Sequence, residues 1–201
     1  MAGLREQKRE RTRRALLAAA RQLFAEKGYA ATTMAEIAAA ADVSPRTAFT
    51  YFPAKDDLLF PDAAERIHIA VAAFEECDPS EDPMQVLVRA LGGADIAGTD
   101  LADEGARLRL LAIRDDPAVR GRALRLLAEA QTEIGRALHE AFPERFSPVQ
   151  AAALTGAFIG ATTAAVDASW AALPDATPLE RHTAVAEAVA QAVVAGNITR
   201  R

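Results

Sequence analysis

The chain contains little cysteine, histidine or aromatic side chain. Cys77 is the one cysteine, so neither an intrachain disulfide nor a cysteine metal site can form. His68, His139 and His182 lie far apart, fit no recognised metal or nucleophile motif, and no glycine-rich phosphate loop occurs. We therefore expect no enzyme, no cofactor and no metal. A helical-bundle enzyme built from scattered carboxylates is the alternative from another functional class.

Patterns typical of strands are also absent. Aromatic residues make up 5% of the chain, and no alternating run of Val, Ile, Thr and Tyr occurs. Alanine, the best helix former, is abundant. Half of the residues are hydrophobic, enough to form a sizeable core. The sequence therefore predicts an all-α fold.

The net charge of −5 for the whole chain argues against nucleic-acid binding, but this charge is unevenly distributed. Residues 1–55 hold ten Lys and Arg against five Asp and Glu, a net charge of +5, and residues 56–201 carry −10. We expect the basic head, residues 1–55, to bind a polyanion, and the acidic body, residues 56–201, not to bind one. An architectural DNA-binding protein would be basic throughout.

No segment has the features of a membrane-targeting or membrane-spanning sequence. The basic N-terminus is followed by no apolar run, which argues against a secretory signal. The uncharged stretch from Phe146 to Val166 approaches spanning length. It is mostly Ala, Gly and Thr, so a buried helix of a soluble protein is the preferred interpretation. We expect a cytoplasmic protein with no membrane partner.

Helix starts are marked by a capping residue followed by proline, whose missing N–H would be unpaired there anyway. Five such pairs occur: Ser44-Pro45, Asp82-Pro83, Asp116-Pro117, Ser147-Pro148 and Thr177-Pro178. Thr33 and Glu36 form a capping box, and Gly28 is suited to end the first helix. These signals predict about nine helices, near 12–27, 33–40, 44–51, 54–77, 82–97, 102–115, 117–141, 148–172 and 178–197. A domain boundary is expected at Pro53 to Lys55, giving domains 1–55 and 56–201.

The second and third predicted helices form a helix-turn-helix. The turn between them is Ala41-Asp42-Val43, and aspartate tolerates the left-handed conformation that such turns often require. The second helix of this motif enters the major groove with its N-terminal residues towards the bases. Arg46 could then bind guanine, and Thr47 could meet a thymine or a phosphate.

The stretch from Arg13 to Leu59, containing TTMAEIAAAADVSPRTAFTYFPAKDDLL, resembles the DNA-binding region of the TetR/AcrR family of transcription regulators. The remainder resembles this family only in the number and length of its helices. The resemblance implies an N-terminal helix-turn-helix domain and a C-terminal helical domain for dimerisation and ligand binding. It further implies a homodimer that binds a palindromic double-stranded DNA operator, usually represses, and leaves when a small-molecule effector binds. Control by a protein partner without a ligand is the alternative.

The resemblance also implies roles for single residues. Thr33 stands where the family's hydroxyl and backbone N–H meet a phosphate, and Lys55 where a lysine at the start of the fourth helix does so. Phe49 replaces a tyrosine of many members, so it is either a core residue or a contact to a thymine methyl group. The predicted DNA-binding set is Thr33, Ser44, Pro45, Arg46, Thr47, Phe49, Thr50, Tyr51 and Lys55.

Each role has a structural alternative. Thr33 could serve only as a helix cap, Arg46 as a surface residue, Tyr51 as packing against the first helix, and Lys55 as a solvated cation. The basic residues before the motif are Arg5, Lys8, Arg9, Arg11, Arg13 and Arg14. They could form a disordered solubilising tail, but an arm along phosphates or into the minor groove is preferred.

The last two predicted helices carry small residues on neighbouring turns. Such residues let helix backbones approach closely, which would offset the cost of about 1 kcal/mol for each mid-helix glycine. Two helices from each chain would form a four-helix dimer interface, with an intramolecular core as the alternative. The predicted interface residues are Ala153, Gly156, Ala157, Gly160, Ala164, Val189 and Val193. Candidate ligand-binding residues between the fourth and eighth helices are His68, Arg107, Gln131, Thr162, Asp167 and Trp170.

Overall fold

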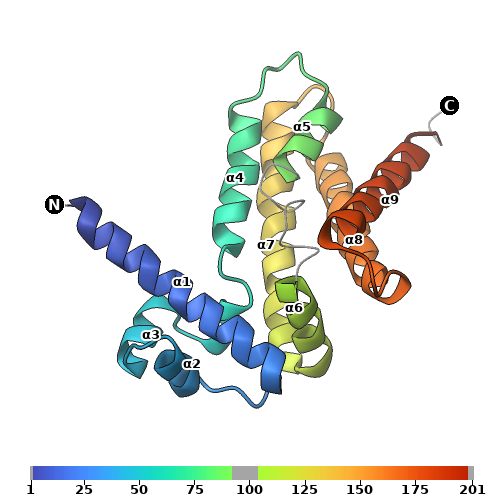
Figure 1. Ribbon diagram of the computed structural model, residues 1–201. Helices are drawn as coiled ribbons and strands as arrows, with labels where there is room; N and C mark the ends of the chain where they lie inside the picture. Colours follow the sequence, from blue (N-terminus) through green and yellow to red (C-terminus); the bar gives the residue numbers. More distant parts are fainter. Residues whose placement is uncertain (1, 92–103, 199–201) are drawn as a thin grey trace. The chain divides into compact units, whose positions relative to one another are not determined.

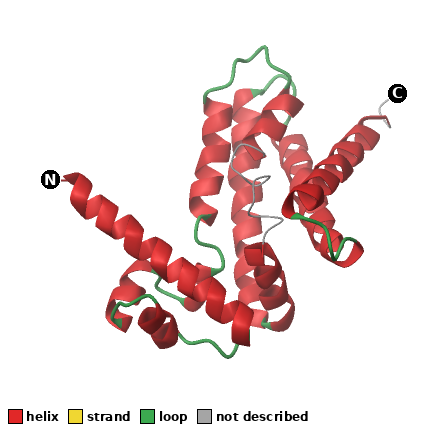
Figure 2. Cartoon of the chain, viewed as in Figure 1, coloured by secondary structure: helices red, strands yellow, loops and turns green. Residues whose placement is uncertain are grey.

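The protein is all-α throughout the part that the computed structural model describes, residues 2–91 and 104–198, with side chains described over 3–91 and 104–192 (Figures 1 and 2). The helices are α1 (Ala2–Lys27), α2 (Met34–Ala40), α3 (Pro45–Tyr51), the 3-10 helix η1 (Lys55–Leu58), α4 (Ala63–Glu75), α5 (Pro83–Leu91), α6 (Glu104–Asp115), α7 (Pro117–Ala141), α8 (Pro148–Ala172) and α9 (Pro178–Ile198). The end of the predicted helix 82–97 lies outside the described residues.

The prolines of all five predicted pairs stand at the first residue of a helix. Asp116 shows the local cause: its Oδ1 accepts hydrogen bonds from the backbone N–H groups of Ala118 and Val119. At the start of α8, Ser147 and Gln150 form a reciprocal capping box. Short-range hydrogen bonds therefore fix these starts, which explains why the sequence predicts them well.

Two helix boundaries differ from the sequence prediction. The first helix begins at Ala2 rather than near residue 12. Thr12, a residue type that often caps helices, lies inside the helix, and no proline occurs in residues 2–11. The predicted helix 54–77 is two elements, η1 and α4. Pro61 lies between them; it lacks an N–H, and it disfavours helical geometry at Phe60. The prediction of one continuous helix from Lys55 is therefore wrong.

The helices divide into two compact units. Unit 1 comprises Met1–Pro61 and Leu108–Arg122, and unit 2 comprises Asp62–Arg107 and Ala123–Arg201. The core of unit 1 joins Leu16, Phe24 and Ile37 to Ala48 and Val119. The α6–α7 corner, whose sequence carries no sign of this association, is thus part of the helix-turn-helix unit.

Unit 2 has its own apolar core. Phe74 of α4 and Leu87 of α5 pack with Ile134 and Leu138 of α7 and with Ala151 of α8. Short α2 and α3 could not be stable as isolated helices, and neither could α5. Tertiary burial therefore holds them in place.

One buried cation connects α8 to α9 in unit 2. The Arg181 side chain is 1% exposed. Its Nη1 donates to the Ser169 carbonyl oxygen at 2.7 Å, and its Nη2 donates to that of Ala176 at 3.2 Å. The guanidinium carbon lies 3.8 Å from the centre of the Trp170 ring. Arg181 thereby fixes the turn between the two helices.

Helix α8 is long and apolar enough to cross a membrane by length and composition, a test that core helices of soluble proteins also pass. Only 17% of its most apolar window is buried within the chain. The sequence favoured a buried helix here, and within a single chain that is wrong. Much of the exposed surface of α8 consists of small apolar residues, such as Ala153, Ala157 and Ala164.

Candidate DNA-binding site

The turn between α2 and α3 is fixed by backbone hydrogen bonds. Asp42 has a φ of 55°, the left-handed conformation that the sequence predicts for this position. The N–H of Asp42 donates to the Ala39 carbonyl at 3.1 Å, and that of Val43 donates to the Ala38 carbonyl at 2.9 Å. This pair of bonds is the Schellman motif, so α2 ends at a defined residue and α3 starts at a defined angle.

Helix α3 is held by its cap and by one buried residue. The Ser44 Oγ accepts a hydrogen bond from the Thr47 N–H at 3.1 Å and lies 2.8 Å from the Thr47 Oγ1. Ala48 is fully buried, which anchors the helix to the core of unit 1. Pro45 and Arg46 are exposed. A rigid helix therefore presents the arginine to solvent.

The structure separates the remaining α3 candidates. The Phe49 side chain is 49% exposed, so the core alternative is wrong and only an apolar contact on the outer face remains. Thr50 is exposed, but its Oγ1 donates to the Arg46 carbonyl within the helix. Tyr51 is half-buried and packs against the core of unit 1, as the structural alternative for this residue predicts.

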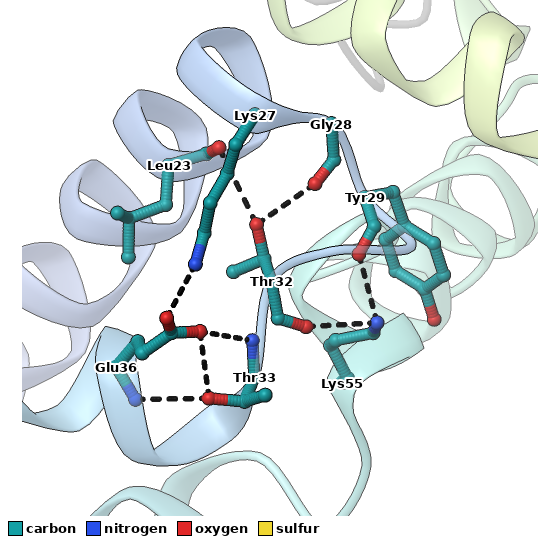
Figure 3. Close-up of polar contacts among 8 residues, drawn as sticks. All are labelled: Leu23, Lys27, Gly28, Tyr29, Thr32, Thr33, Glu36 and Lys55. Atoms are coloured by element: carbon teal, nitrogen blue, oxygen red, sulfur yellow. Dashed lines mark hydrogen bonds and ion pairs between the residues drawn. The ribbon is translucent and has the colours of Figure 1, made fainter.

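Lys55 is bound inside unit 1 (Figure 3). Its Nζ donates to the carbonyl oxygens of Tyr29 at 2.8 Å and Thr32 at 3.0 Å. The same atom lies 3.9 Å from the centre of the Tyr29 ring. Burial lowers the Lys55 pKa, and the carboxylates of Asp116 and Asp56 partly oppose that shift. Lys55 thus ties η1 to the α1–α2 loop. The predicted phosphate contact would need an N–H of its ammonium group that these two carbonyl oxygens do not use.

The α1–α2 loop contains two further residues of the site, Tyr29 and Thr32, that no sequence pattern indicated. The hydroxyl of Thr32, 1% exposed, donates to the Gly28 carbonyl at 2.8 Å. Burial, followed by the charges of Asp56, Asp116 and Asp57, raises the Tyr29 pKa to about 12. Tyr29 and Lys55 are 26 positions apart, so no local signal in the sequence could connect them.

Thr33 is a helix cap, and its polar groups are bound within the chain (Figure 3). The Glu36 Oε2 accepts hydrogen bonds from the Thr33 N–H and hydroxyl, each at 2.8 Å. The Lys27 Nζ lies 2.5 Å from the Glu36 Oε1. These bonds, that from Lys27 being the largest cause, lower the Glu36 pKa to about 2. The capping alternative for Thr33 is therefore present in the structure, and its phosphate contact stays a prediction.

The predicted dimer residues lie mainly on the open face of α8. Ala153, Ala157, Gly160 and Ala164 are exposed, and Gly156 is half-buried. A Cβ built on Gly160 would meet nothing within 4 Å in the chain. Val189 is 6% exposed and so belongs to packing within its own chain. The side chain of Val193 lies outside the described residues.

The candidate ligand-binding residues are spread over four helices. His68, Arg107 and Asp167 are exposed, and Arg107 pairs with Glu104 at 3.0 Å. Thr162 donates its hydroxyl to the Phe158 carbonyl of its own helix. Trp170 is covered by Arg181. Gln131 of α7 approaches α8, its Nε2 standing 4.0 Å from where a Gly156 Cβ would lie. The ligand site stays a prediction.

A locked turn followed by an exposed, arginine-bearing helix defines a helix-turn-helix of the kind that enters the major groove of DNA. Residues 16–60 match the sequence model of bacterial regulatory proteins, tetR family. The transcriptional regulator TcmR of Streptomyces glaucescens is 31% identical over 160 residues, covering 72% of this chain and 70% of that protein. The chain belongs to the TetR family and is a DNA-binding transcriptional regulator.

Two further proteins are similar to the chain. The transcriptional repressor LfrR of Mycolicibacterium smegmatis is 41% identical over 81 residues, 40% of this chain and 42% of that protein. The structure of Thermus thermophilus FadR, a TetR-family repressor in complex with lauroyl-CoA, has the same fold. It superposes with a TM-score of 0.56 at 19% identity, covering 90% of this chain and 94% of that one.

Proposed function

We propose that the protein is a cytoplasmic repressor that binds a palindromic operator as a homodimer, has no catalytic activity, and leaves the operator when a small molecule binds. The observation that carries this proposal is the outward presentation of Arg46 on α3, whose N-terminus is fixed by Ser44 and whose far side is anchored by Ala48. A fixed arginine can make a bidentate contact to a guanine in the major groove. The names of LfrR and FadR, both repressors, support the sign of regulation.

The open face of α8 supports the dimer. Only 17% of the helix's most apolar window is buried within the chain, and the exposed residues there include Ala153, Ala157 and Ala164. Exposed apolar surfaces of this kind mark interaction sites. A two-fold dimer would cover the same face of both chains at once. Two copies of α3 could then reach successive major grooves, about 34–36 Å apart.

The acidic body favours a cationic or neutral effector. Residues 56–201 carry a net charge of −10, which repels anions at long range. A ligand changes the operator affinity only if it binds the two conformations differently, and the coupling, typically about 1–3 kcal/mol, must be reciprocal. Calorimetric titration with and without operator should therefore show weaker ligand binding when DNA is present. Equal affinities would favour control by a protein partner.

The test of DNA binding starts from an operator selected out of a random duplex library. Replacing Arg46 with Ala should relax selectivity at one base pair in each half-site, at a cost of about 1–3 kcal/mol. Arg125→Ala, at an exposed position of α7, is the matched control and should leave selectivity unchanged. If the wild-type protein selects no sequence, or Arg46→Ala retains the full base preference, the proposal is wrong.

A further inference from the structure

The first turns of α1 extend beyond the helices that pack against it (Figure 1). Residues 3–9 are exposed, and the first buried side chain is that of Leu16. Arg13 marks the point where α1 meets the rest of unit 1: its Nη2 donates to the Pro61 carbonyl at 3.0 Å, and its guanidinium lies 5.8 Å from the centre of the Phe52 ring. Residues 2–12 thus form a helical extension about 16 Å long.

The charges on this extension are not distributed evenly. At about 100° per residue, Arg5 and Arg9 fall within about 60° of Leu16 and Ala20 around the helix axis. Leu16 and Ala20 are buried against the core that α2 and α3 share. In a continuous helix, the face that carries Arg5 and Arg9 is therefore the continuation of the face on which the helix-turn-helix packs.

The opposite face of α1 also carries arginines. Arg11 and Arg14 point about 150° away from the centre of the first face. Both are exposed, and the Nε of Arg14 pairs with the Glu10 carboxylate at 2.6 Å. The N-terminal half of α1 thus offers two faces with two arginines each, one on the side of α3 and one on the side away from it; Arg5, Arg9 and Arg11 lie in the extension and Arg14 just after it.

We infer that the helical extension of α1 binds the phosphates of duplex DNA flanking each half-site, through Arg5 and Arg9, with Lys8 beside them. This inference rests on the proposed function, because the helix-turn-helix brings the DNA to that side of α1. Guanidinium groups on one stripe complement a row of phosphates. The 16 Å length corresponds to about five base pairs at 3.4 Å each. The extension lengthens the footprint without reading bases.

The test compares two double variants that change the charge equally. Arg5→Gln with Arg9→Gln removes the inner face, and Arg11→Gln with Arg14→Gln removes the outer one. Glutamine and arginine have similar helix propensities, so α1 should stay helical, which circular dichroism checks. Binding to the selected operator with ten flanking base pairs is measured by fluorescence anisotropy between 50 and 200 mM KCl.

In the operator-bound dimer the inner-face variant loses two phosphate contacts at each half-site, four in all, which lowers the magnitude of the slope of log K against log salt by about 3.6. Wild-type affinity should therefore fall about 150-fold further over this salt range than that of the inner-face variant, while the outer-face variant follows the wild type. Trimming the flanks to two base pairs should weaken the wild type and leave the inner-face variant unaffected. Equal slopes for the two variants, or no effect of trimming on the wild type, would overturn the inference. Failure of the wild type to select an operator would instead overturn the proposed function.

Discussion

Unit 1 and unit 2 are stabilised in different ways. Unit 1 is tied by polar bonds between distant segments: Lys55 to the α1–α2 loop, Arg13 to Pro61, and the Arg109 Nη1 to the Leu59 carbonyl at 3.2 Å. Both units have an apolar core, but in unit 2 the buried Arg181 joins only the neighbouring helices α8 and α9, and only 17% of the most apolar window of α8 is buried. Directional bonds suit a unit that holds α3 at a fixed angle, and the exposed small residues of α8 are where the proposed dimer would form.

The largest effects are expected from two glycine substitutions, one at a packed position of α7 and one on the exposed face of α8. A Cβ on Gly135 would lie 3.2 Å from the Ala152 Cα, so Gly135→Leu should force α7 and α8 apart and cost about 1–3 kcal/mol of unfolding free energy. Gly160→Leu meets open space in the chain and should act only on the dimer. Urea unfolding at several protein concentrations measures both.

In that experiment the wild-type midpoint should rise with protein concentration, because only the folded chains associate. Gly135→Leu should lower the midpoint and keep this dependence. Gly160→Leu should abolish the dependence, and sedimentation should show a monomer. If Gly160→Leu keeps the wild-type concentration dependence, the face of α8 around Gly160 is not an interface.

The lysines of unit 1 should affect stability alone, without any change in association. Lys55→Met leaves the carbonyls of Tyr29 and Thr32 without their charged donor, and should lower the unfolding free energy by about 1–3 kcal/mol. Lys27→Met removes only an exposed ion pair with Glu36 and should cost less than about 1 kcal/mol. Chemical denaturation without DNA measures both. Equal costs would show that the internal bonds of Lys55 add nothing to stability.

The smallest effect concerns the pH dependence of the α2 cap. Bonds from Lys27 and Thr33 lower the Glu36 pKa from 4.5 to about 2. The folded state therefore gains stability from the ionised carboxylate above pH 4.5, and loses it as pH falls towards 2. Glu36→Gln keeps the capping bonds but not the charge. Its deficit in Tm should be largest at pH 7 and shrink between pH 5 and 2; a deficit constant over this range contradicts the account.

The local parts of the site were predictable from sequence. The left-handed Asp42, the Thr33 capping box and the Ser44 cap all depend on residues within five positions of one another, so their bonds follow from residue type and spacing. The role of Lys55 was not predictable in this way. Its partners lie 23 and 26 residues away, and residue type alone does not distinguish a lysine bound to carbonyls from one that meets phosphate.

Residue type and spacing alone established the helices, their starts, the helix-turn-helix and the family resemblance, because caps, prolines and apolar periodicity act over a single turn. Tertiary structure determined which surfaces of each helix are buried and which stay exposed. It placed the α6–α7 corner in the core of unit 1 and left much of α8 exposed. Burial depends on segments far apart in the chain, and the apolar pattern of a helix shows that it needs a partner without showing which one.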